Sequence, residues 1–163
     1  MGVLDTQLFR AVMGRFATGV TVITVDKEDG GVHGMTANAF MSVSLNPALV
    51  LLSVAKTAAM HGYMETSGPF GVSFLHAGQA DVSNHFAGRP DARVGETIIY
   101  SRLAGAPVLE SSLARISCRR WAVYDGGDHT LFVGEVTDLQ ADEENPLLYY
   151  RGAYGVFAGH SDC

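Results

Sequence analysis

The sequence predicts a mainly β protein, a small β-barrel with a few short helices, and three observations lead to this fold class. Short segments rich in β-branched residues, such as "VTVITV" at 20–25, alternate with turn residues. Two longer strand-like segments, 113–124 and 129–141, flank the turn "DGGD". In the first of these, the apolar alternation changes phase near Arg119 and Arg120, as expected of a β-bulge in a bent barrel strand.

The length and composition favour one folded domain over residues 1–163. A chain of 163 residues can bury a substantial core, and 47% hydrophobic with 17% charged residues is unlike a disordered protein. The net charge of −6, with no run of Lys or Arg, argues against nucleic acid or an anionic membrane as a partner.

The cysteines and the terminal sequence favour a cytoplasmic protein. Two cysteines, Cys118 and Cys163, do not make a disulfide framework and suit a reducing compartment. The N-terminus has no basic region followed by an apolar core, so we expect no signal peptide. The longest apolar run, 48–55, is too short to span a bilayer.

The first half of the chain is predicted to contain two helices and three strands. The first helix presents one apolar face, begins at Asp5 or Thr6 and ends at Gly19. Its face consists of Leu8, Phe9, Val12, Met13 and Phe16. The three strands are predicted at 20–25, as part of a hairpin, at 46–55, as a buried strand, and at 69–76. The second helix is predicted at 56–68, with Thr57 as its cap and Gly68 at its end.

The second half is predicted to be mostly strand. Residues 78–88 indicate one or two helical turns, with Val82 and Phe86 on one face. Residues 89–110 are interpreted as a loop with one short strand, and the chain ends in one or two short strands after the long pair.

Common catalytic and metal-binding motifs do not occur. The chain contains no phosphate-binding loop, dinucleotide glycine motif or serine nucleophile elbow. Its six histidines fall at no metal-ligand spacing, so no metal site is predicted.

Small residues dominate the segment "HGMTANAFMSVSLNP" at 33–47. Short side chains let backbone amides approach a planar or anionic ligand, while Thr36 and Asn38 offer hydrogen-bonding groups. A tight strand crossing in a small barrel would require the same composition. The residues of this segment leave both interpretations open.

Six segments, taken together, resemble a known family. "GVTVITV", "GMTANAFMSVSLNP", "SGPFGVSFL", "HFAGR", "GDHTLFVGEV" and "NPLLYYRGAYGVF" occur in this order over most of the chain. They resemble the flavin reductases that serve two-component flavin monooxygenases. The resemblance implies an FMN-binding split barrel of Greek-key type, a homodimer, and FMN or FAD near its interface. It also implies an NAD(P)H:flavin oxidoreductase that takes hydride from NADH or NADPH and supplies reduced flavin to a partner monooxygenase.

The same resemblance implies specific site residues. A histidine, His129, would lie at the nicotinamide side of the flavin and serve catalysis. Cofactor binding is implied for Thr36, Ala37, Asn38, Ala39, Ser53, Val54, Ala55, Lys56, Phe86, Ala87, Gly88, Arg89 and Tyr154. Family members often carry a Ser-Ser-x-Thr-like run where this chain has Ala55, Thr57, Ala58 and Ala59, which leaves the phosphate contacts open.

Two other functions fit parts of the pattern. The same barrel could hold flavin without turnover, as a carrier or redox sensor. A barrel that handles haem breakdown or pyridoxine phosphate would predict more basic residues in the pocket segments than this chain has.

Overall fold

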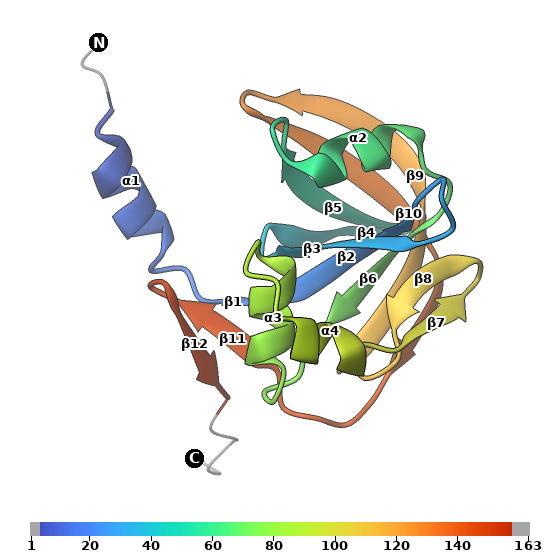
Figure 1. Ribbon diagram of the computed structural model, residues 1–163. Coiled ribbons are helices and arrows are strands. Elements are labelled where there is room, and N and C mark those ends of the chain that lie inside the picture. Colours follow the sequence, from blue (N-terminus) through green and yellow to red (C-terminus); the bar gives the residue numbers. More distant parts are fainter. Residues whose placement is uncertain (1–3, 158–163) are drawn as a thin grey trace.

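The largest element of the fold is a seven-stranded antiparallel sheet. Figure 1 shows the computed structural model, which describes residues 4–157. The sheet order is β3 (Val32–Ala37), β2 (Thr21–Asp26), β6 (Phe70–Phe74), β9 (Ala114–Gly126), β10 (His129–Ala141), β5 (Ala48–Ala55) and β4 (Phe40–Leu45). The mainly β class predicted from the sequence is therefore confirmed.

The sheet curls toward a barrel and remains open along one seam. Its two edge strands, β3 and β4, follow each other directly in the chain, yet neither pairs with the other among the described residues. This opening is what a split barrel requires, and it leaves one side of β3 without a strand partner.

Buried side chains fill the inside of the curled sheet. Ile23, Leu52, Phe70 and Phe132 are at most 1% exposed. Helix α2 (Ala59–Thr66) lies over this core and inserts its two methionines, Met60 and Met64. The cluster they form fixes α2 against the sheet, since removing such buried apolar surface from water is the main favourable term in folding.

The end of α2 is held by a residue far away in the sequence. The Arg120 guanidinium on β9 donates to the carbonyl oxygens of Met64 and Glu65, at 3.0 and 2.6 Å. These carbonyls belong to the last turn of the helix, where no further N–H is available. The predicted N-cap Thr57 is wrong, because Ala58 occupies that position without a side-chain bond, and the helix ends before Ser67 rather than at Gly68.

Helix α1 (Thr6–Met13) stands apart from the sheet (Figure 1). The Asp5 carboxylate accepts hydrogen bonds from the amides of Gln7 and Leu8, which confirms the predicted start. The helix ends at Gly14 rather than at Gly19, because residues 18–19 form strand β1 (Thr18–Gly19). The residues of its predicted apolar face are not buried in this chain. Each of them is more than half exposed: Leu8, Phe9, Val12, Met13 and Phe16.

The interpretation of 89–110 as a loop with one strand is wrong. This region forms helix α4 (Ala92–Thr97) and the hairpin of β7 (Tyr100–Leu103) and β8 (Ala106–Leu109). The hairpin turns through Ala104 and Gly105, both with positive φ. Strand β8 is buried along its whole length, so packing against the main sheet stabilises the hairpin.

The long hairpin of β9 and β10 is confirmed, and so is its irregularity. Val133 pairs with Ala122 while the next residue, Gly134, pairs with Arg120. Trp121 is therefore the extra residue of a β-bulge, one position after the predicted change of phase.

The remaining elements form a smaller layer beside the open seam. Strands β1, β11 (Leu147–Tyr150) and β12 (Ala153–Val156) make a three-stranded sheet, and helix α3 (Ala80–Phe86) lies near it (Figure 1). As predicted, Val82 and Phe86 of α3 pack on the same buried cluster. Within residues 4–157, no helix has the length and apolar character needed to cross a membrane.

Candidate functional site

A cleft of about 730 Å³ opens where β3, the start of α2 and the end of α3 meet. Most of one wall is β3 itself, whose residues 32–36 line the cleft in succession. The other lining residues are Ala58, Ala59, Met60, His85, Phe86, Ala87, Gly88, Pro90 and Tyr100. Its size is that of a typical small-molecule or cofactor site.

Strand β3 brings unpaired backbone groups to this cleft. It is an edge strand that pairs with β2 along one side only. In an antiparallel pair, alternate N–H and C=O groups point away from the partner strand, so those on the open side of β3 are free for a ligand. The small residues of "GMTA" at 34–37 leave these groups accessible.

A smaller cleft of about 180 Å³ continues from the first. The two share Thr36 and Ala87, and the smaller one adds Ala37, Asn38 and Tyr154. Together, the two clefts bring residues from three of the four predicted cofactor-binding segments to one place, although those segments come from distant parts of the chain.

Helix α3 is fixed to β3 and β12 through one buried residue. Ser83 is fully buried; its carbonyl oxygen accepts from the Thr36 hydroxyl at 2.7 Å, and its hydroxyl accepts from Tyr154 at 2.8 Å. The Tyr154 hydroxyl also lies 3.3 Å from the Asn84 side-chain oxygen. The hydroxyls of Thr36 and Tyr154 therefore hold α3 at a fixed distance from β3 and β12.

A glycine lets α3 approach β3 closely. A Cβ atom at Gly34 would lie 2.4 Å from the Phe86 ring, far inside normal contact. The absence of a side chain at position 34 thus determines where the Phe86 ring can lie in the cleft.

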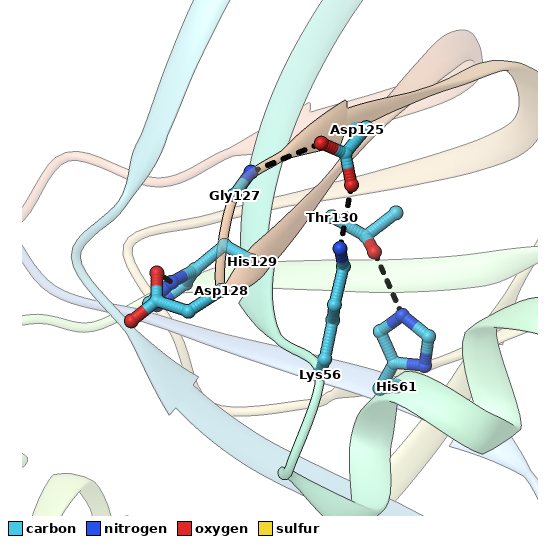
Figure 2. A network of polar contacts seen from close by, with 7 residues as sticks. All are labelled: Lys56, His61, Asp125, Gly127, Asp128, His129 and Thr130. Atoms are coloured by element: carbon cyan, nitrogen blue, oxygen red, sulfur yellow. Dashed lines mark hydrogen bonds and ion pairs between the residues drawn. The ribbon is translucent and has the colours of Figure 1, made fainter.

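A second group of predicted residues meets at the turn between β9 and β10 (Figure 2). The Lys56 ammonium lies 2.5 Å from the Asp125 carboxylate, which also accepts from the Gly127 amide at 3.3 Å. The hydrogen bond from Lys56, followed by that from Gly127, lowers the pKa of Asp125. Lys56 is consequently already paired, although both side chains are exposed and such pairs contribute little stability.

On the other side of this turn, His129 pairs with its neighbour Asp128 (Figure 2). The distance from His129 Nδ1 to the Asp128 carboxylate is 2.7 Å, and this hydrogen bond lowers the pKa of Asp128. The contact orients the imidazole and leaves Nε2 without a hydrogen-bond partner among residues 4–157.

The predicted residues therefore fall into two groups. Thr36, Ala37, Asn38, Phe86, Ala87, Gly88 and Tyr154 line the two clefts. Ala39, Ser53, Val54, Ala55, Lys56, Arg89 and His129 do not line them. Val54 points into the core, the Ser53 amide donates to Ala39, and Arg89 lies between the lining residues Gly88 and Pro90.

Sequence reasoning missed several residues that build the site. His33, Gly34, Met35 and Met60 adjoin predicted segments, so their position in the chain could have indicated them. Ser83 carried no such signal, because its role depends on contacts with residues 47 and 71 positions away.

The comparisons with known proteins agree with this architecture. A family model described as "Flavin reductase like domain" matches residues 13–158. The chain therefore belongs to the flavin reductase-like family, as its six motif segments indicated.

Curated relatives match over nearly the whole chain. An NADH-dependent flavin reductase from a Rhodococcus species is 41% identical over 94% of this chain and 89% of its own length. The reductase component of 4-hydroxyphenylacetate 3-monooxygenase from Thermus thermophilus is 42% identical over 91% of this chain and 94% of its own.

Solved structures share the fold. A flavin reductase in its native state superposes with a TM-score of 0.89 at 46% identity, over 96% of this chain and all 100% of that one. The NADH:FAD oxidoreductase SgcE6 of Streptomyces globisporus, solved with NAD and FAD fragments, gives a TM-score of 0.88 at 37% identity, over 99% and 100% of the two chains.

The contact between Thr36 and Ser83 yields a stability prediction. Thr36→Val keeps the shape of the side chain and removes the hydroxyl donor, so the free energy of unfolding should fall by about 1 kcal/mol. Thr36→Ser retains the donor and should lose less. Urea unfolding of both variants checks this; equal stability of Thr36→Val and Thr36→Ser would contradict a structural role of the hydroxyl.

Proposed function

We propose that this protein is an NAD(P)H-dependent flavin reductase that reduces FMN or FAD and supplies the reduced flavin to a partner monooxygenase. The observation that carries the proposal is the cleft along the open edge of β3, in a chain of the flavin reductase-like family. The relatives are named as NADH-dependent flavin reductases and as reductase components of monooxygenases, which supports the same reaction here.

The cleft fits a flavin in shape and in chemistry. A flavin ring is planar and carries nitrogen and oxygen atoms around its pyrimidine rim, which free backbone groups of residues 34–38 can bond without a bulky side chain against the plane. When bound, the flavin accepts a hydride at N5 from the nicotinamide. The protein then has to bind, stack and orient the two rings and exclude water.

Arg89 is better placed than Lys56 to hold the flavin phosphate. Its neighbours Gly88 and Pro90 both line the large cleft, and Arg89 has no carboxylate partner within residues 4–157. Lys56, by contrast, would first have to leave Asp125. A guanidinium can bond a phosphate through two N–H groups at once.

We assign the nicotinamide side of the flavin to His129. The bond from Nδ1 to Asp128 fixes the ring, and Nε2 remains available for the carboxamide of the nicotinamide. Direct hydride transfer needs no acid or base, so the proposed role of His129 is to orient the donor.

A homodimer would cover apolar surface that this chain leaves open. The apolar face of α1 is exposed, and so are Met41, Val43 and Leu45 on β4 and Trp121 on β9. Exposed apolar surface on this scale is typical of an interaction face. We propose that two copies pair through it in the cytoplasm, near the flavin, and that residues 1–163 of each act as one flavin reductase-like domain.

The decisive experiment is a turnover assay. Purified protein should oxidise NADH or NADPH in the presence of FMN or FAD, followed by the loss of absorbance of the reduced nicotinamide. Flavin binding without oxidation of either nucleotide would instead support a flavin carrier or redox sensor.

The assignment of Arg89 gives a prediction on affinity. Arg89→Gln should raise the Kd for FMN about tenfold, because a charge-assisted bond to phosphate is lost, and should leave the Kd for riboflavin nearly unchanged. Lys56→Gln should have the smaller effect. Fluorescence titration measures both ligands, with Arg93→Gln on α4 as the matched control; an equal loss of riboflavin affinity would refute a phosphate contact.

The assignment of His129 predicts a different pattern. His129→Ala should lower kcat about tenfold while the Kd for flavin changes less than about twofold, since the side chain orients the nicotinamide. Asp128→Asn should produce a weaker version of the same change. If flavin affinity falls more than kcat, His129 contacts the flavin or supports the scaffold instead.

The proposed interface is tested by measuring the mass of the protein in solution. Light scattering should give about twice the monomer mass of 17.3 kDa for the native protein. Val12→Glu places a charge on the apolar face of α1 and should shift the population toward monomer, whereas Gln7→Glu on the same helix should not. A monomer in the unaltered protein would overturn the dimer.

A further inference from the structure

A separate cleft of about 560 Å³ lies between the β2–β3 turn and helix α2. One wall is the turn itself, and the other is the exposed side of the helix. The cleft is lined by Asp26, Lys27, Glu28, Asp29, Ala59, Gly62, Tyr63, Thr66 and Ser67. Only Ala59 and Ser67 of these residues belong to segments that carry the family resemblance; the residues of the turn and the rest of the helix wall lie outside them.

This second cleft adjoins the large cleft along β3. Ala59 lines both. At the boundary, the rings of His33, which lines the large cleft, and Tyr63, which lines the second, lie with centroids 4.6 Å apart and planes inclined by 31°. A ligand that extends beyond the large cleft would therefore meet an aromatic pair first.

The ring pair is suited to a neutral aromatic ligand. Burial, with a smaller contribution from the charge of Lys27, lowers the pKa of His33, which favours the uncharged imidazole. Tyr63 is half-buried against the core and anchored there, with one side on the cleft. Stacking of a nucleobase on such an aromatic surface does not depend on a particular hydrogen-bonding pattern.

The turn offers polar groups of both signs. Lys27 pairs with Asp29 at 3.0 Å, and Asp26 is engaged by both terminal nitrogens of Arg102 at 2.6 and 2.8 Å. Glu28 has no partner among residues 4–157 and is free to accept hydrogen bonds from ligand hydroxyls. Carboxylates commonly accept from ribose hydroxyls of dinucleotides.

We propose that this cleft binds the adenosine of a dinucleotide whose other half occupies the flavin site. The inference rests on the proposed flavin reductase function and extends it to a region that FMN has no group to fill. Its structural basis is the continuity of the two clefts, the His33–Tyr63 pair at their boundary and the free carboxylate of Glu28. The adenosine can come from FAD or from the nicotinamide dinucleotide.

Gly62 provides a way to block the cleft without disturbing the fold. A Cβ atom there has no heavy atom within 4 Å, and the residue lies on the exposed side of α2. Leucine is a much better helix former than glycine, so Gly62→Leu should fill space in the cleft without lowering the melting temperature. Gly68→Leu, also into open space but outside the cleft, is the matched control.

The titrations use FMN, FAD and NADH. If the adenosine is that of FAD, Gly62→Leu raises the Kd for FAD at least about tenfold and that for FMN less than about twofold. If the cleft holds the adenosine of NADH, Gly62→Leu raises the KM for NADH at least about tenfold with either flavin. Gly68→Leu changes neither quantity.

Tyr63 supplies an independent check. Tyr63→Phe keeps the ring and should behave like the native protein, while Tyr63→Ala should reproduce the loss seen with Gly62→Leu. Equal effects of Gly62→Leu on FMN and FAD, with no change in the KM for NADH, would overturn the adenosine site. A native protein that reduces no flavin would refute the proposed function itself, whatever the variants do.

Discussion

The one-sided pairing of β3 is the constraint on which the rest of the site depends. Because β3 pairs with no strand other than β2 within residues 4–157, the backbone amides and carbonyls of its outer edge have no strand partner there, and the sheet stays split at that position. A closed barrel would satisfy those groups internally and leave no polar wall for a ligand. The small residues at 34–37 serve this arrangement, since larger side chains would cover the same backbone.

An open edge is useful only if its neighbours are held at a fixed distance. Ser83 does this by accepting from Thr36 on β3 and Tyr154 on β12, so that one buried residue joins three elements. Arg120 does the equivalent for α2 by binding its last carbonyls from β9. Both contacts are made by residues that do not themselves react, and both fix the walls between which a flavin would lie.

Local sequence patterns predicted the strands well because their period is set by which face is buried. The β-branched run that became β2, the long hairpin and the bulge at Trp121 all followed from alternation alone. The β7–β8 hairpin was missed because it turns through Ala104, a residue that seldom adopts positive φ, instead of the usual asparagine or aspartate. Thr57 was chosen as a helix cap on propensity, whereas the burial of Met60 and Met64 and the contacts of Arg120 hold α2 where it is.

The site could be predicted only in part, because some of its contacts join residues far apart in the sequence. The segments 36–38 and 86–88 could be found by their resemblance to a family, and the structure brings them together. The pairing of Lys56 with Asp125 could not be foreseen, because it joins residues 69 positions apart across a hairpin end. The cleft beside α2 lies mostly outside the motif segments, since a turn and a helix face create it jointly.

The contact between Gly34 and Phe86 also limits how this protein can vary. Any side chain at position 34 would meet the Phe86 ring, which lines the large cleft, so the ring would have to shift and the shape of the cleft would change with it. In a library of substitutions, position 34 should therefore tolerate almost nothing while its neighbours accept conservative exchange. The displaced Phe86 ring would then block the cleft, although the chain would still fold.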